Sequence, residues 1–296
     1  MRILVTGKNG QVGHELLRSL ASLGEVIGVD IEDCDLSQPN AIDALVDRVQ
    51  PDIIINPAAY TAVDKAESEP AMAHAINAQA PEVLTKQAAR RNIPMIHYST
   101  DYVFDGKKIG AYTEEDMPNP QSVYGKTKWL GEEAVRNHTA KHIILRTSWV
   151  FGAHGANFLK TMLWLAQERD KLSIVADQVG APTSASMLAD VTAEIVRQLF
   201  ESDAHHKYGT YHLVADGEAS WHSYAQLVVK LANAGGVVTK VTPEAIGAIT
   251  TQEYPMPATR PANSRLNTDK IKRVFMVKLA HWQHEVERVL KQVLQG

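Results

Sequence analysis

A tyrosine and a lysine four residues apart, Tyr124 and Lys128, are the side chains of this sequence best suited to proton transfer. On a helix this spacing places the phenol and the ammonium on one face, one turn apart. An ammonium close to a phenol favours the phenolate and lowers a pKa that is ordinarily about 10. Such a tyrosine can exchange a proton with a carbonyl or an alkoxide near neutral pH. Together with the hydroxyl of Thr100, the stretch from Tyr98 to Lys128 is the candidate catalytic segment.

A glycine-rich turn near the N-terminus supplies the second signal. The pattern G-x-x-G-x-x-G lies between a predicted strand, Arg2–Thr6, and a predicted helix from about Gln11 to Ser22. Glycine lets the backbone approach a pyrophosphate, and the start of the helix offers free N–H groups and a partial positive charge. The alternative interpretation of the same pattern is an ordinary glycine-rich surface turn. The residues of the turn predicted to bind a dinucleotide cofactor are Gly7, Asn9, Gly10, Gln11, Val12 and Gly13.

Asp30 ends the next predicted strand, Glu25–Asp30, about 20 residues after Gly10, where an acid commonly holds a ribose 2′-OH. An acid there repels a 2′-phosphate, so NADH should be accepted, while Asp30 alone does not decide whether NADPH is accepted too. Small residues at the end of the third strand would leave room for the cofactor, although they suit ordinary packing equally well. The further predicted cofactor contacts are Asp35 and Leu36 beside the adenine, and Ala58, Ala59 and Tyr60.

Short β-branched runs alternate with helical patterns, which predicts βαβ units in a doubly wound parallel α/β sheet of the Rossmann type. Further strands are predicted at Asp52–Asn56, Met95–Ser99 and His142–Thr147, and helices at Ala41–Val49, at Pro70–Arg91 and around Tyr124. After Trp149 the elements become shorter and predict a second, smaller α/β substrate domain. Its predicted elements are helices at Phe158–Glu168, Ala185–Phe200, Tyr224–Ala234 and Trp282–Leu294 and a strand at Thr210–Val214. The predicted domains are 1–148, to which 184–204 returns, and 149–296.

The composition excludes several function classes. Acidic and basic residues are mixed along the chain and the formal charge is −4, so neither a nucleic acid nor an anionic membrane is an expected partner. No apolar run approaches the ~18 residues of a membrane span, and the N-terminus shows no signal peptide, which predicts a cytoplasmic protein. The one cysteine, Cys34, rules out an intramolecular disulfide and a cysteine-based metal cluster.

Several separate motifs, in order along the chain, resemble the extended branch of the short-chain dehydrogenase/reductase superfamily. More narrowly, they resemble the dTDP-4-dehydrorhamnose reductase family. The matching segments are the glycine turn, 61–67 (TAVDKAE), 99–106 (STDYVFDG), 124–128 (YGKTK), 146–150 (RTSWV), 177–183 (DQVGAPT) and 260–266 (RPANSRL).

The resemblance implies reduction of the C4 ketone of a dTDP-linked 4-dehydro sugar by NADPH or NADH. It assigns Tyr124 as the proton donor, Lys128 as the residue that lowers the Tyr124 pKa and bonds the nicotinamide ribose, and Thr100 as a hydrogen-bond donor to the ketone oxygen. A surface Tyr–Lys pair, a core tryptophan and a solvated arginine are the structural alternatives. The substrate contacts that the resemblance implies are Val63, Asp101, Tyr102, Trp149 and Arg260.

Related enzyme classes are distinguished by single positions. Dehydratases of this branch carry an Asp-Glu pair after the threonine, whereas here Thr100 is followed by Asp101 and Tyr102. A nucleotide-sugar 4-epimerase shares the three catalytic positions and stays open, as does a non-catalytic regulatory subunit of the same fold. The histidines show no metal-ligand spacing.

Members of the family are associated with a divalent ion, such as Mg²⁺, that bridges a homodimer through helix carboxylates. Glu15 matches this pattern, but Ser186 stands where a second acid is expected, so no metal ligand is assigned. A homodimer is left open.

Overall fold

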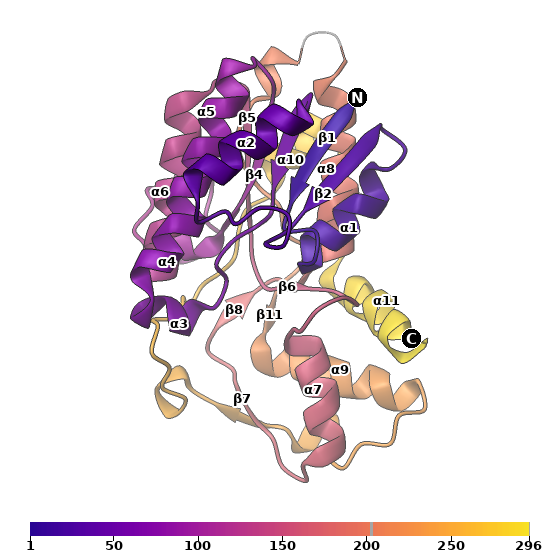
Figure 1. The fold of residues 1–296 in the computed structure, drawn as a ribbon. Coiled ribbons are helices and arrows are strands. Elements are labelled where there is room, and N and C mark those ends of the chain that lie inside the picture. The colour runs from indigo at the N-terminus through magenta and orange to yellow at the C-terminus, as the bar shows by residue number, and fades with distance from the viewer. Residues whose placement is uncertain (202–203, 296) are drawn as a thin grey trace.

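The computed structural model describes residues 1–201 and 204–295. At its centre lies a six-stranded parallel sheet with the strand order β10-β5-β4-β3-β1-β2, flanked by helices on both faces (Figure 1). This confirms the predicted doubly wound α/β fold. The strands of the sheet are β1 (Arg2–Thr6), β2 (Glu25–Val29), β3 (Ile53–Asn56), β4 (Met95–Thr100), β5 (His142–Thr147) and β10 (Gly209–His212).

Buried residues alternate between the two faces of the sheet, as period-2 strands require. In β1, Ile3 and Val5 join one hydrophobic cluster while Leu4 joins another. The first cluster lies under α1 (Gln11–Leu20) and α8 (Ala185–Leu199). The opposite face is covered by α2 (Pro39–Val49), α5 (Ala80–Arg90) and α6 (Val123–His138).

The long helix predicted over Pro70–Arg91 is interrupted. It consists of α4 (Pro70–His74), the π-helix η1 (Ala75–Gln79) and α5, and a short helix α3 (Val63–Ser68) precedes it. The π segment presents Asn77, whose side chain accepts a hydrogen bond from the Tyr60 N–H at 2.8 Å and donates to the Tyr60 carbonyl at 3.1 Å. The segment therefore anchors the loop that follows β3. Short π-helical segments of this kind are frequent at functional sites.

The second part of the chain forms a smaller region beyond the carboxyl ends of the strands (Figure 1). It contains short two-stranded pairings, β6 with β9, β7 with β12 and β8 with β11. Outside the central sheet and α8, the elements of the second half of the chain are β6 (Val150–Phe151), α7 (Phe158–Glu168), β7 (Ser173–Val175), β8 (Val179–Gly180), β9 (Thr183–Ser184), η3 (His205–Lys207), β11 (Ala219–Ser220), α9 (Trp221–Ala234), η4 (Pro243–Ala245), β12 (Gly247–Ile249), η5 (Thr251–Glu253), α10 (Asp269–Phe275) and α11 (Trp282–Gln295).

Three elements of this second part return to the sheet: α8 packs on α1, β10 extends the sheet beside β5, and α10 packs on β10 and α8. The domain limits 1–148 and 149–296 stay a prediction. None of the helices in the described part of the chain is long and apolar enough to cross a membrane.

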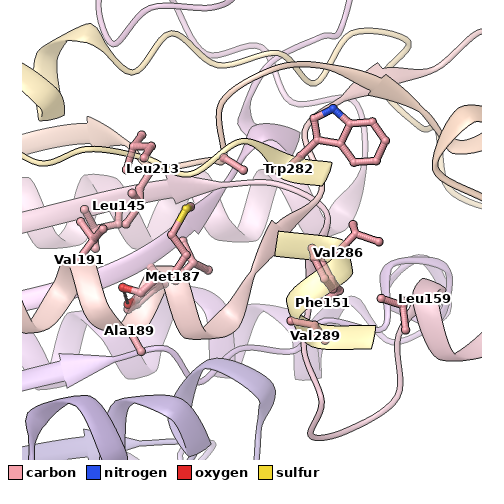
Figure 2. Close-up of a cluster of buried hydrophobic side chains, with 14 of the residues drawn as sticks. Leu145, Phe151, Leu159, Met187, Ala189, Val191, Leu213, Trp282, Val286 and Val289 are labelled. Carbon is pink, nitrogen blue, oxygen red and sulfur yellow. Dashed lines mark hydrogen bonds between the residues drawn. The ribbon is translucent and has the colours of Figure 1, made fainter. Parts of the chain in front are cut away.

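A continuous apolar cluster ties the two parts together. Figure 2 shows Trp282, Val286 and Val289 on α11 beside Phe151 of β6 and Leu159 of α7. The spacing of the three α11 residues places them on one helix face, and all five side chains are buried. This cluster therefore packs α7 and α11 together with β6.

Candidate active site

A cavity of about 760 Å³ lies at the carboxyl ends of the parallel strands. It is centred on β1 and β3, where the chain order of the sheet reverses, which is the usual ligand position in open α/β sheets. The predicted cofactor residues that line it are Gly7, Asn9, Gly10, Gln11, Val12, Gly13, Asp30, Ala58, Ala59, Tyr124 and Lys128.

The glycine turn forms a backbone cradle that side chains would fill. Gly7 has a φ of +63°, a conformation that favours glycine. A Cβ at Gly13 would lie 1.9 Å from the Gly7 carbonyl oxygen, so the turn and α1 could not pack this closely with any other residue. Asp30 is held at the turn because its carboxylate accepts the Asn9 N–H at 2.9 Å. The cavity residues therefore fit a dinucleotide, with the acid beside the turn.

Two buried hydroxyls, those of Thr147 and Ser148, line the same cavity and have no hydrogen-bond partner among the described residues. Buried polar groups are nearly always paired in folded proteins, so unpaired groups in a cavity indicate a ligand. This is a second, independent sign that a polar molecule belongs there.

Three predicted cofactor residues do not line this cavity. The Asp35 carboxylate accepts the Ser37 N–H at 2.9 Å in the turn after β2. Leu36 packs against the apolar cluster under α2. The Tyr60 hydroxyl donates to Glu69 at 2.7 Å. Each of these three side chains contacts other residues of the protein, and their contacts with the cofactor remain predictions.

Tyr124 and Thr100 meet at the edge of the cavity. Thr100 ends β4, and Tyr124 lies in the first turn of α6, whose N-cap Ser122 accepts the Gly125 N–H at 3.1 Å. A Cβ at Gly125 would lie 2.2 Å from the Tyr102 carbonyl oxygen, so glycine at this position lets α6 approach the turn after β4. Burial raises the pKa of Tyr124 well above its ordinary value, while a hydrogen bond with Thr100 works in the opposite direction. The phenol is accordingly protonated at neutral pH.

The predicted effect of Lys128 on the Tyr124 pKa stays a prediction, and the structure shows which groups the lysine contacts. The Lys128 ammonium donates to the Tyr98 carbonyl at 2.6 Å and lies 3.4 Å from the His97 Nε2. Lys128 is only 2% exposed, and this burial lowers its own pKa to about 8. The four-residue spacing puts both groups on one face of α6, and the ammonium is bound to the backbone of β4.

Asp101 follows Thr100 in the short helix η2 (Asp101–Val103) and lines the cavity. Burial raises the pKa of Asp101 to about 6, although hydrogen bonds with Ser264 and Thr100 oppose this. The predicted substrate residue is thus a carboxyl group whose protonation is sensitive to pH near neutrality.

A second cavity of about 930 Å³ adjoins the first. Val63, Tyr102 and Trp149 line both cavities and so mark their junction. Trp149 stacks on Trp221 with ring centroids 3.7 Å apart, and its φ of +50° is a strained backbone conformation for a large side chain. The second cavity has an aromatic and apolar wall, to which Phe158, Leu165 and Ile174 also contribute, and three cations, Arg169, Lys171 and Arg260.

Arg260 lines the second cavity as predicted, but it is already paired. Its guanidinium donates to the Asp64 carboxylate at 2.5 Å, and the same carboxylate accepts the Ala258 N–H at 3.1 Å. A second bond, at 3.5 Å, reaches the Tyr102 hydroxyl. Asp64 on α3 thereby holds the proline-rich loop over the cavity. Arg265 lines neither cavity and pairs with Glu218 at 3.3 Å.

A buried ion pair links α6 to β5. Glu132 on α6 accepts two hydrogen bonds from Arg146 on β5, at 2.9 and 2.7 Å, and pairs with Arg136 at 3.0 Å. Burial works against the charged form of Glu132, but the two guanidinium groups hold its pKa below the ordinary value. The pair is fully desolvated and fixes α6 against β5.

The family-implied metal bridge does not fit this chain. The Glu15 carboxylate pairs with Arg18 at 3.1 Å, and the Ser186 hydroxyl accepts a hydrogen bond from Arg288 at 2.6 Å. A guanidinium at the position of the second acid supplies positive charge where a divalent cation would need a ligand. Within residues 1–201 and 204–295, no group of three His, Cys, Asp or Glu side chains is placed to hold a metal.

Sequence reasoning missed several residues of the two cavities. Thr147 and Ser148 lie in the matching segment 146–150 and could have been found there. Asp64, which holds the loop over the second cavity, lies in the matching segment 61–67, whereas Trp221 had no local signal because its role depends on a partner far along the chain. His97 lies within the predicted strand Met95–Ser99, and the structure places it against Lys128.

These features define a class: a dinucleotide-dependent oxidoreductase of the extended short-chain dehydrogenase/reductase type, with a second cavity that adjoins the cavity lined by Tyr124. Comparison with known proteins is more specific. The family model for the RmlD substrate binding domain matches residues 1–295. A dTDP-4-dehydrorhamnose reductase from Salmonella typhimurium is 47% identical over 297 aligned positions, covering 99% of this chain and 98% of the relative.

Solved structures agree. The crystal structure of a dTDP-4-dehydrorhamnose reductase from Clostridium acetobutylicum superposes with a TM-score of 0.91 at 37% identity and covers all of both chains. A dTDP-4-dehydrorhamnose reductase from Bacillus anthracis in complex with NADP gives a TM-score of 0.88 at 31% identity, over 98% of this chain and 99% of that one. The chain belongs to the dTDP-4-dehydrorhamnose reductase family, and its cofactor is NADPH or NADH.

Proposed function

We propose that this protein reduces the C4 ketone of dTDP-4-dehydro-β-L-rhamnose to dTDP-β-L-rhamnose with NADPH or NADH. The observation that carries the proposal is the junction of the two cavities at Val63, Tyr102 and Trp149, beside the hydroxyls of Thr100 and Tyr124. A sugar at this junction would have its nucleotide in the second cavity and its ketone next to a proton donor.

Each reacting group has one task in this proposal. The cofactor, in the cavity at the glycine turn, supplies hydride to the ketone carbon. Tyr124 donates its phenolic proton to the oxygen, and Thr100 donates a hydrogen bond that stabilises the developing negative charge. The raised pKa of Tyr124 suits this direction of transfer, because the acid is fully protonated before each turnover. Lys128 lines the same cavity and would bond the nicotinamide ribose.

The second cavity offers what a dTDP-sugar needs. The Trp149–Trp221 stack and Phe158 form a flat apolar wall for a base or sugar ring, and the cations at its edge complement a diphosphate. Among these cations Arg260 is our choice for the diphosphate, with Asp101 and Tyr102 at the hexose. Gln178 also lines this cavity. We further propose a cytoplasmic enzyme with a small-molecule substrate and no nucleic-acid or membrane partner, as the mixed charge suggests.

Turnover with dTDP-4-dehydrorhamnose tests the proposal. Loss of nicotinamide absorbance in proportion to the dTDP-rhamnose formed is the expected result with at least one of NADH and NADPH. Interconversion of nucleotide sugars without net loss of reduced cofactor would indicate a 4-epimerase instead. No turnover with either cofactor would leave the regulatory subunit as the better explanation.

A further inference from the structure

An ion-pair cluster borders the cofactor cavity at the ends of β1 and β2. The Lys8 ammonium contacts the Asp33 carboxylate at 2.5 Å and the Glu32 carboxylate at 3.2 Å. The Glu32 oxygen that contacts Lys8 also accepts a hydrogen bond from the Asn9 side-chain amide at 3.0 Å. Glu32 and Asp33 together therefore hold the side chains of both residues that follow Gly7 in the glycine turn.

The cluster is continuous with Asp30, the acid expected at the ribose 2′-OH. The Asp33 carboxylate accepts the Asp30 N–H at 3.0 Å, through the same oxygen that contacts Lys8. Asp30 lines the cofactor cavity, whereas the side chains of Lys8 and its two acidic partners do not. Glu32 and Asp33 therefore hold the lysine outside the cavity, close to the position where the ribose is expected.

The aliphatic stem of Lys8 lies over β2. A Cβ at Gly28 would be 3.1 Å from the Lys8 Cβ, so glycine at this position leaves room for the lysine stem. The Lys8 N–H donates to the Val29 carbonyl at 3.1 Å, which fixes the backbone of the turn against the end of β2. Because the lysine ammonium is a point charge on a flexible stem, it can turn toward the ribose position once the acids release it.

The charges of the cluster are unequal. Asp30, Glu32 and Asp33 are ionised near neutral pH and Lys8 is protonated, so the net charge is about −2. The hydrogen bond between Lys8 and Asp33 raises the pKa of the lysine and lowers the pKa of the carboxyl group, which stabilises both charged forms. The 2′-phosphate that distinguishes NADPH from NADH carries a charge of about −1.5 to −2. It would approach a negative cluster whose lysine is already paired.

The cavity is a ligand site on separate grounds, because the buried hydroxyls of Thr147 and Ser148 line it without a partner among the described residues. Exposed ion pairs such as those of Lys8 contribute little to stability. Glu32 and Asp33 can therefore be replaced without unfolding the protein, which makes their effect on cofactor binding measurable.

We propose that Glu32 and Asp33 determine the cofactor preference of this protein by holding Lys8 away from the ribose 2′ position, so that NADH binds more tightly than NADPH. With the two acids in place, a 2′-phosphate meets the carboxylate of Asp30 and no released ammonium from the turn. Without them, Lys8 is free to bind the phosphate. The preference is thus assigned to two residues outside the cavity as well as to Asp30. The inference rests on the proposed function only for the dinucleotide.

Cofactor binding to the wild-type protein is the first test. Titrations of nicotinamide fluorescence give the Kd values of NADH and NADPH without any sugar. We expect NADH to bind about tenfold more tightly, because the repulsion acts over short but partly screened distances. Equal affinities, or tighter binding of NADPH, would overturn the proposal. A protein without turnover would still give both values, so a failure of the proposed reaction is distinguishable from a failure of this inference.

Replacement of both acids by their amides tests the role of the lysine. In the double variant Glu32→Gln/Asp33→Asn, the Kd of NADPH should fall about tenfold, since two negative charges are removed and Lys8 is released. Adding Lys8→Gln to the double variant should reverse most of this gain, whereas Lys8→Gln alone should change the Kd of NADPH much less. An unchanged Kd of NADPH in the double variant would overturn the proposal. A gain that survives Lys8→Gln would overturn the role of Lys8.

A matched control removes the same charge elsewhere. Asp47→Asn/Glu82→Gln neutralises two exposed acids that pair with other cations outside the cavity. Its Kd values for both cofactors should stay within about twofold of wild type, because charges more than a Debye length away are screened. A tenfold gain in NADPH affinity in this control would show that overall charge sets the preference, and would overturn the assignment to Glu32 and Asp33.

Discussion

Removing the phenolic hydroxyl of Tyr124 tests the proposed mechanism most directly. In Tyr124→Phe the ring can keep its edge contact with Tyr102, whose centroid lies 5.3 Å away, so binding of the cofactor should change little. The proton donor and its hydrogen bond with Thr100 are lost together. A positioned general acid contributes ~10²–10⁴-fold, which corresponds to a rise of about 3 to 5 kcal/mol in the activation free energy.

The assay follows nicotinamide absorbance at saturating nucleotide sugar, while cofactor affinity is measured separately by titration of the nicotinamide fluorescence. We expect kcat to fall at least ~100-fold with an unchanged cofactor Kd. Tyr208→Phe is a matched control, because it removes a phenol hydroxyl that lies outside both cavities. A Tyr124→Phe enzyme within tenfold of wild-type kcat would show that another group, or water, donates the proton.

Three further variants test the surroundings of the site. Asp30→Ala should raise the NADPH/NADH ratio of kcat/KM by about tenfold, since a carboxylate beside the turn repels a 2′-phosphate; an unchanged ratio would mean that the ribose is recognised elsewhere. Asp64→Asn should lower the KM for the nucleotide sugar about threefold without changing kcat, because Arg260 would lose the carboxylate that competes with a diphosphate; a higher KM would show instead that Asp64 holds Arg260 in place for the substrate. Glu132→Ala should reduce the free energy of unfolding by ~3–5 kcal/mol in urea titrations, because Arg146 would be left buried without its partner; a loss below about 1 kcal/mol would contradict that account.

The local parts of the site were predictable from the sequence. The strand, glycine turn and helix from Arg2 to Leu20 form as expected, and Asp30 returns to the turn because parallel neighbours β1 and β2 end at the same edge. Thr100 and Tyr124 also meet at this edge, because Thr100 is the last residue of β4 and Tyr124 lies in the first turn of α6. In each case the positions of the strands, turns and helices follow from the residues at the turns and from the spacing of apolar residues. Both can be read from short stretches of the sequence.

The interruption at η1 was not predictable in the same way. The helical pattern from Pro70 to Arg91 continues through it, and only the bonds between Asn77 and the backbone of Tyr60 explain the extra residue in the turn. The short strands of the second region were missed for a related reason. Pairings of two or three residues leave too little periodicity in the sequence to distinguish them from loops.

The sequence by itself determined the fold class, the cofactor turn and the candidate catalytic residues. Only the tertiary structure decided their electrostatic states. Burial raises the Tyr124 pKa and lowers that of Lys128. The tertiary structure also pairs Arg260 with Asp64, 196 positions away, and places His97 against Lys128. The physical reason is that desolvation and ion pairing depend on everything that surrounds a side chain in space, whereas a sequence motif specifies only its neighbours along the chain.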